Sequence, residues 1–191
     1  MNKTKLGFAV CGSFCTFSKI KEEIKKLAES DIYDIYPIFS EYAYSTDTRF
    51  CKSSDFVSEI EEICKRKSIK SIKEAEPIGP KKILDILAVA PCTGNTLSKL
   101  SAGITDTSVT MAVKAHLRNG RPVVIGVSTN DALGTSASNI GCLLGRKNIY
   151  FVPMRQDDCI GKPRSLVCDF SKIGETLNFA LKNEQIQPIF I

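Results

Sequence analysis

The chain has 191 residues, of which 43% are hydrophobic and 25% are charged, and its formal net charge is +5. This balance excludes a disordered chain, and no apolar run approaches the roughly 20 residues that cross a bilayer. The densest basic stretch, residues 65–73, is flanked by glutamates, so we expect a solvated helix face rather than a nucleic-acid-binding patch.

Strand and helix patterns alternate through the first part of the chain. Residues 6–10 and 33–39 have the apolar runs of strands, and the apolar stripe over 17–27 predicts an amphipathic helix between them. A second stripe over 56–63 predicts another helix. Residues 68–82 contain two prolines and a glycine, and we expect them to form a polar loop.

The alternation continues to the end of the chain. A buried strand is predicted over 83–89, and Pro91 is expected to stop it. The later predicted elements are a helix that includes Leu97 and Leu100, a helix over 106–119 closed by Gly120, a strand over 123–127, a helix over 131–144, a strand over 149–152 and a helix through Ile173, Leu177 and Leu181.

Repeated strand–helix units of this kind predict a single α/β domain over residues 1–191, with a Rossmann-like, doubly wound parallel sheet. Such folds bind ligands outside the carboxyl ends of their strands. Four turns should therefore converge on one site, namely residues 11–18, 39–48, 91–96 and 128–135.

The turn over 91–96 is the most informative of the four. It contains Thr93, Asn95 and Thr96 around a glycine and opens a helix, so backbone N–H groups and short polar side chains face a ligand. Cys92 lies in the same turn and is a thiolate candidate, but no neighbouring base is evident.

The first two turns offer a phosphate site. Neither a G-x-G-x-x-G nor a P-loop motif is present, so a nicotinamide dinucleotide site is unsupported. Gly12, Ser13 and the following helix N-terminus could hold a single phosphate, with Ser40 adding a hydroxyl. Taken alone, these serines are more typical of helix N-caps.

Further polar residues follow in the second and fourth turns. Arg49 could bind a carboxylate through two hydrogen bonds, although a surface arginine is the simpler alternative. Ser128 and Asn130 repeat the polar chemistry of the third turn. Asp131 is a candidate general base, but capping its own helix is the commoner role. His116 lies on an apolar stripe, which favours a packed histidine.

The eight cysteines form no C-x-x-C pair, and the chain has one histidine. No metal site is therefore predicted. We expect most of the cysteines to be small buried side chains in a reducing compartment, and the start of the chain shows no signal-peptide pattern, which predicts a cytosolic protein.

The turn over 91–96, with Ala102, Gly103, Ile104 and Asp106 after it, resembles the flavoprotein family of FMN-containing cysteine decarboxylases and flavin prenyltransferases. The order of elements agrees over roughly residues 5–153. This resemblance implies a flavodoxin-like fold, a trimer or a multiple of one, and FMN as cofactor. The implied FMN contacts are Gly12, Ser13, Ser40, Pro91, Thr93, Thr96 and Ser128.

A narrower set of motifs resembles the dipicolinate synthase B subunits. It comprises C-G-S-F-C-T at 11–16, S-T-D-T-R-F at 45–50, E-A-E-P-I-G-P at 74–80, S-T-N-D-A-L-G at 128–134, and K-N-I-Y-F-V-P with Q-D-D over 147–158. The resemblance implies oxidation of a dihydrodipicolinate-level diacid to dipicolinic acid in the mother-cell cytoplasm of a sporulating bacterium. It also implies a nicotinamide-dependent A subunit that carries NAD(P).

Departures from the decarboxylases limit the alternatives. Their catalytic histidine has no counterpart here, their P-x-M-N-x-x-M element keeps only Asn130, and Asn95 stands where the prenyltransferases carry lysine. A stand-alone decarboxylase or prenyltransferase is therefore disfavoured, and a non-catalytic supporting subunit stays open. For an oxidoreductase subunit we expect Asn95, Asn130 and Asp131 in catalytic roles, with Arg49 and Asn95 holding substrate carboxylates.

Overall fold

Within residues 3–191, seven strands form one sheet that is parallel except at its end. The computed structural model describes residues 3–191, so the first two residues of the predicted domain lie outside the described residues. The parallel strands are β1 (Thr4–Val10), β2 (Tyr33–Phe39), β3 (Ile86–Cys92), β4 (Val123–Thr129) and β5 (Ile149–Phe151). Two short antiparallel strands, β6 (Met154–Arg155) and β7 (Leu166–Cys168), complete the sheet.

The strand order is β2-β1-β3-β4, and the free side of β4 then pairs with two different strands. Val123–Ile125 pair with β5 in parallel, whereas Ser128 and Thr129 pair with Val167 and Leu166 of antiparallel β7. The carboxyl end of β4 is therefore covered by a strand that comes from much later in the chain.

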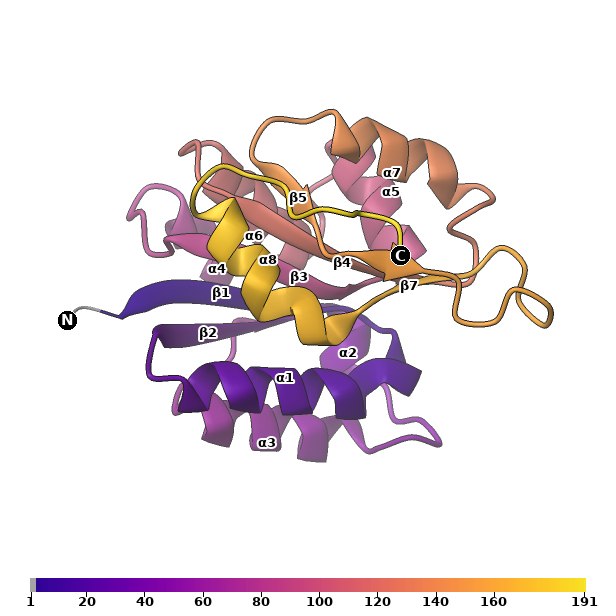
Figure 1. Cartoon of the computed structure of the whole chain (residues 1–191). Coiled ribbons are helices and arrows are strands. Elements are labelled where there is room, and N and C mark those ends of the chain that lie inside the picture. The colour runs from indigo at the N-terminus through magenta and orange to yellow at the C-terminus, as the bar shows by residue number, and fades with distance from the viewer. Residues whose placement is uncertain (1–2) are drawn as a thin grey trace.

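Helices cover both sides of the sheet (Figure 1). Helices α1 and α3 pack side by side along β2, α8 packs against β4 and β5, and α4, α5, α6 and α7 form the remaining layer. Their bounds are α1 Phe17–Glu29, α2 Glu41–Ser45, α3 Ser53–Cys64, α4 Ile72–Ala75, α5 Gly94–Ala102, α6 Ser108–Leu117, α7 Ser136–Leu144 and α8 Ile173–Ala180, with short 3-10 turns at Phe14–Thr16, Glu76–Ile78 and Phe170–Lys172.

The core follows the predicted periodicity. All seven residues of β3 are buried, as expected for a strand with helices on both faces. In α1 the buried side chains are Phe17, Ile20, Ile24 and Leu27, which confirms the predicted stripe. The α/β fold with a mostly parallel sheet is thus confirmed.

The prediction for the third strand was wrong at both ends. β3 begins at Ile86 and continues through Pro91 to Cys92, rather than covering 83–89. Its register with β4 shifts between Val89 and Cys92, so Pro91 lies at an irregular position that needs no ladder hydrogen bond from its nitrogen. The strand therefore ends directly before Thr93, which begins the next turn.

Residues 68–82 contain more structure than the predicted loop. Ser71 and Glu74 form a capping box that begins α4, and Ala75 and Ile78 are fully buried. Ile69 also forms a bridge with Ile38 of β2. In the sequence, the two prolines and the glycine of this segment indicate a loop more strongly than Ser71 and Glu74 indicate a helix.

Three helices also have boundaries that differ from the predictions. α7 begins at Ser136, because residues 131–135 form a turn in which the Asp131 carboxylate accepts the Thr135 N–H. α6 begins at Ser108 after the Thr107 cap and ends before Gly120, whose φ is +68°. α8 ends at Ala180, so Leu181, which belongs to the predicted stripe, follows the helix and is exposed.

The cysteine prediction was also wrong. All eight thiols are free, but only Cys11, Cys92 and Cys168 are buried, so most of them reach solvent. His116 is buried on α6, as predicted, and its Nε2 lies 3.1 Å from the Pro122 carbonyl oxygen. Within residues 3–191, no helix combines the length and apolarity that a bilayer crossing requires.

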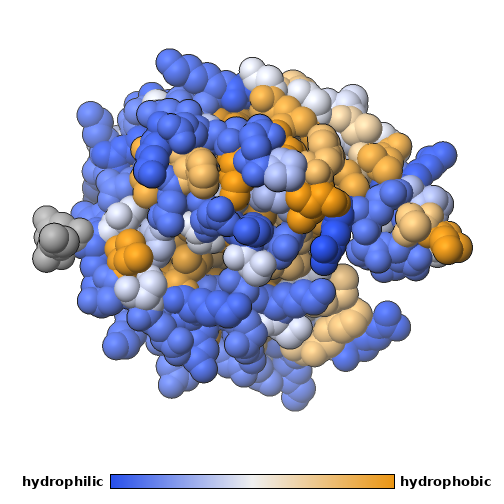
Figure 2. Space-filling view, viewed as in Figure 1, coloured by the Kyte–Doolittle hydropathy of each residue, from blue (hydrophilic) through white to orange (hydrophobic). Residues whose placement is uncertain are grey.

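The connection between β6 and β7 projects from the body of the molecule (Figure 1). Figure 2 shows mostly hydrophilic side chains over α1 and α3, and an apolar tip on the projecting lobe. Ile160 in this connection is 91% exposed. The projecting segment, here called the hairpin, comprises residues 156–165.

Candidate active site

Two cavities lie side by side where the parallel strands end. The larger, here called the main crevice, has a volume of about 500 Å³ and extends from the first turn to the hairpin. The smaller, here called the side cavity, has about 440 Å³ and extends toward α2 and α5. They share Gly12, Phe14 and Thr93, so one elongated ligand could occupy both.

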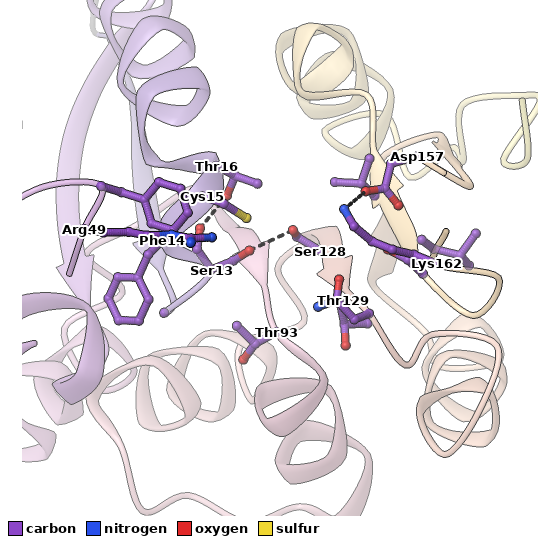
Figure 3. A pocket seen from close by; sticks show the side chains of 16 residues that line it. Ser13, Phe14, Cys15, Thr16, Arg49, Thr93, Ser128, Thr129, Asp157 and Lys162 are labelled. Carbon is purple, nitrogen blue, oxygen red and sulfur yellow. Dashed lines mark hydrogen bonds and ion pairs between the residues drawn. The ribbon is translucent and has the colours of Figure 1, made fainter. Parts of the chain in front are cut away.

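The floor of the main crevice is a pair of hydroxyl groups. Ser13 Oγ lies 2.9 Å from Ser128 Oγ, which joins the end of β1 to the end of β4 (Figure 3). Ser13 occupies the N-cap position of the turn before α1, but its side chain makes no capping hydrogen bond. The N-cap interpretation of Ser13 was therefore wrong.

The side cavity contains hydroxyl groups from two other strand ends. Ser40 follows β2 at the N-cap of α2, is buried, and also makes no side-chain cap bond. Thr93 follows β3 and caps α5 by accepting the Thr96 N–H. Thr96 Oγ1 lies 3.2 Å from Thr93 Oγ1 and 3.3 Å from Cys11 Sγ. The cavity thus combines a helix N-terminus with three hydroxyl groups.

One wall of the main crevice is aromatic and cationic. Phe14 and Phe50 line it together with Arg49, whose guanidinium carbon lies 4.9 Å from the centre of the Phe50 ring. Figure 3 shows the Arg49 guanidinium directed toward Ser13. An arginine held this way can bind a carboxylate at the crevice floor.

The hairpin forms the opposite wall. Lys162 Nζ lies 3.0 Å from Asp157 Oδ2, and Ser165, Leu166 and Val167 complete this side. The Ser165 hydroxyl and the Lys162 ammonium lower the pKa of Asp157, and Asp157 in turn raises the pKa of Lys162. Both groups are therefore charged at neutral pH.

The structure brings most of the predicted site residues together, but in two groups. Ser13, Arg49, Ser128 and Asn130 line the main crevice; Ser40, Asn95 and Thr96 line the side cavity; Gly12 and Thr93 line both. Pro91 and Asp131 line neither cavity. Asp131 instead holds the turn before α7 through its bond to the Thr135 N–H.

The buried thiols and the histidine have no charged form available for catalysis near neutral pH. Burial raises the pKa of Cys11 to about 11 and that of Cys92 well above its usual value. Burial also lowers the pKa of His116 to about 4. A thiolate role for Cys92 therefore has no support in the geometry.

The donor set of the two cavities fits FMN. A phosphate needs hydrogen-bond donors at a helix N-terminus, which the side cavity offers through the Ser40 hydroxyl and the first backbone N–H groups of α5 after Thr93. Lys99, which also pairs with Asp106, adds a positive charge to this cavity, and Glu41 adds a negative one. A flavin ring needs a flat, partly apolar surface with a few polar groups, which the main crevice offers. Among residues 3–191, no cluster of His, Cys, Asp or Glu could hold a metal ion.

The hairpin residues were missed by the sequence analysis. Asp157 and Lys162 stand five positions apart around Gly161, a spacing that suits an ion pair across a tight turn. That spacing was the available signal. It could not show that the turn folds back over the end of β4, because this depends on antiparallel pairing of β7.

Comparisons with known proteins identify the family of the chain. The model of the Flavoprotein family matches residues 1–166. The B subunit of dipicolinate synthase from Bacillus subtilis (strain 168) is 42% identical over 187 residues, which cover 98% of this chain and 93% of that protein.

Solved structures give the same result. The B subunit of dipicolinate synthase from Bacillus halodurans superposes with a TM-score of 0.90 at 41% identity, covering 100% of this chain and 98% of that one. The FMN-dependent cysteine decarboxylase SpaF superposes with a TM-score of 0.69 at 21% identity, covering 93% and 97%, and shows a shared fold. The chain therefore belongs to the flavoprotein family, and within that family to the group of dipicolinate synthase B subunits.

Proposed function

We propose that the chain binds FMN across the two cavities and acts as one subunit of an oxidoreductase that converts a dihydrodipicolinate-level diacid to dipicolinate. The similarity to the B subunit from Bacillus subtilis supports this assignment and a nicotinamide-dependent A subunit as partner. Membership of the flavoprotein family supports the flavin.

One structural observation carries the flavin proposal. Ser13 and Ser40 stand at N-cap positions, yet neither hydroxyl caps its helix, and both line the cavities. Buried or partly buried hydroxyl groups usually have hydrogen-bond partners. Ser13 Oγ already lies 2.9 Å from Ser128 Oγ, so a phosphate or a flavin in these cavities would give Ser40 its partner and Ser13 a second one.

The proposed reaction removes one hydride and one proton from the substrate and forms an aromatic ring. A bound flavin supplies an acceptor for the hydride, and NAD(P) on the partner subunit would carry the electrons away. The residues of this chain orient the substrate, and the aromaticity of the product provides driving force.

Polar residues of the turns would supply that orientation. Asn130 is exposed in the main crevice and Asn95 in the side cavity, so their amides could bind different ends of a bound molecule. Asp131 stays a prediction as proton acceptor; its Oδ2 accepts the Thr135 N–H, which leaves Oδ1 to take a proton.

The visible absorption spectrum of the purified chain, before and after addition of FMN, tests the proposal. Flavin absorption that survives gel filtration is the expected result. A colourless chain that does not bind added FMN would remove the flavin from the proposal and favour a supporting subunit instead.

Co-expression with the A subunit tests the reaction itself. We expect dipicolinate formation only when both chains are present, and flavin bound to this chain. Dipicolinate formation by the A subunit alone at an unchanged rate would contradict a catalytic contribution. Light scattering on the same samples tests the proposed trimer or multiple of one.

A further inference from the structure

Two cations face each other across the main crevice. Arg49 comes from the segment between α2 and α3, and Lys162 comes from the hairpin. Figure 3 shows them on opposite sides of the Ser13–Ser128 hydroxyl pair. No other lysine or arginine lines this crevice in the described part of the chain. A ligand on the hydroxyl floor would therefore have a positive charge at each end.

Both cations are held in place by neighbouring groups. The Arg49 guanidinium lies over the Phe50 ring, and the Lys162 ammonium is paired with Asp157. A lysine ammonium has three donors, so one bond to Asp157 leaves two for a ligand. Side chains that are already held lose less conformational freedom when a ligand binds.

The space between the cations suits a flat ring. Phe14 and Phe50 border one side and Leu166 and Val167 the other, while the floor is made of neutral hydroxyl groups. The single carboxylate among the lining residues of this crevice, Asp157, is already engaged by Lys162. A ligand with two carboxylates would therefore find one cation for each of them, and the one anion nearby is already paired.

We propose that the main crevice selects a flat dicarboxylate by binding one carboxylate at Arg49 and the other at Lys162. This rests on the proposed function, because it takes the main crevice as the place where the substrate is oxidised, with the substrate ring packed against the flavin ring that shares this crevice. Lys162 is then a specificity-determining residue, and Asp157 is a positioning residue that keeps the ammonium at the edge of the crevice.

Calorimetric titration of the full-length chain, with and without FMN, tests this inference. The probes are pyridine-2,6-dicarboxylate and pyridine-2-carboxylate, which share a ring and differ by one carboxylate. We expect the dicarboxylate to bind at least about tenfold more tightly, because a charge-assisted hydrogen bond contributes about 1.5–3 kcal/mol and 1.4 kcal/mol is about tenfold.

The substitution Lys162→Met should weaken dicarboxylate binding about tenfold and leave monocarboxylate binding nearly unchanged. Lys162→Arg keeps the charge and should retain the preference for the dicarboxylate. Lys172→Met is a matched control, because Lys172 pairs with Glu175 at 2.8 Å and lies outside both cavities. It should change neither affinity.

Several results would overturn the inference. Equal affinities for the two probes, or a Lys162→Met chain that still prefers the dicarboxylate, would exclude the clamp. A chain that binds FMN but not the dicarboxylate would also exclude it and would leave the flavin proposal standing. A chain that binds neither would overturn both proposals.

Discussion

The floor and the hairpin wall of the main crevice are built in different ways. The floor, formed where the parallel strands end, presents neutral groups such as Ser13 after β1 and Ser128 at the end of β4. The hairpin wall presents a charged pair, Asp157 and Lys162, on a segment that projects from the fold. The parallel sheet thus creates the cavity, and the hairpin determines much of its charge.

Lowering the pH should have the largest effect on stability, because His116 is buried in the part of the fold that contains the parallel strands. Burial lowers its pKa from 6.5 to about 4, so the unfolded chain takes up a proton before the folded one. The free energy of unfolding should be constant above about pH 6.5 and should fall by up to about 3 kcal/mol toward pH 4. Urea titrations across this pH range measure the change.

The variant His116→Gln provides the control for this prediction. Its amide can still donate to the Pro122 carbonyl oxygen that His116 Nε2 contacts, but it does not titrate. Its stability should change less between pH 6.5 and pH 4 than that of the unmodified chain. An equal loss in both proteins would assign the acid sensitivity to other groups.

The second-largest effect on stability is expected where β4 packs between β3 of the parallel strands and β7, which follows the hairpin. A Cβ at Gly126 of β4 would lie 2.9 Å from Ala90 Cβ of β3 and 3.0 Å from Cys168 Sγ of β7. Because Ala90 cannot move without its strand, Gly126→Ala should lower the free energy of unfolding by about 2 kcal/mol. Thermal denaturation measures the loss.

Gly141→Ala is a matched control for this prediction. Gly141 lies on the exposed side of α7, and a Cβ there would meet nothing within 4 Å. The substitution should stabilise the protein by up to about 1 kcal/mol, because alanine favours the helix. If both substitutions were neutral, the close packing of β3, β4 and β7 would not matter to stability.

The same division explains what could be predicted from the sequence. On the parallel side, period and turn residues are local signals, so the elements and the residues Ser13, Ser40, Thr93 and Ser128 were found at strand ends. The hairpin side depends on which strand β7 meets, and a three-residue strand carries almost no pattern. Lys162 and Asp157 were missed for that reason.

The boundary errors have a related physical cause. Pro91 normally ends a strand, but here the register shift beside it lets β3 continue to Cys92. Asp131 looks like the cap of a helix, but its carboxylate stabilises a separate turn, and α7 begins only at Ser136. In both cases the strand partner or the turn, rather than the helix or strand propensity of the residue, decides where the element begins or ends.

Removing one hydroxyl from the parallel side should weaken flavin binding without unfolding the protein. Ser40→Ala should lower FMN affinity about tenfold, which corresponds to about 1.4 kcal/mol, because a hydrogen bond to a charged phosphate is lost. Stability should change little, since the Ser40 hydroxyl makes no cap bond. Flavin fluorescence titration and thermal denaturation measure the two quantities.

Ser71→Ala is the matched control, because Ser71 is also an N-cap serine but its hydroxyl does accept the Glu74 N–H. It should cost about 1 kcal/mol of stability and leave FMN affinity unchanged. The opposite pattern, with Ser40 important for stability and not for FMN, would return Ser40 to a capping role.

The smallest expected effect tests the charge of the hairpin wall. Asp157→Asn removes a carboxylate whose pKa is held low by the Ser165 hydroxyl and Lys162, so a negative charge disappears at neutral pH. If Asp157 keeps the Lys162 ammonium at the crevice, the variant should bind pyridine-2,6-dicarboxylate about fivefold more weakly, or about 1 kcal/mol, because the ammonium is no longer held beside the ligand. Tighter binding would mean that the lost repulsion between Asp157 and the ligand matters more than the position of Lys162. Calorimetry at low and high salt distinguishes the two, since a gain from lost repulsion should shrink as salt screens it.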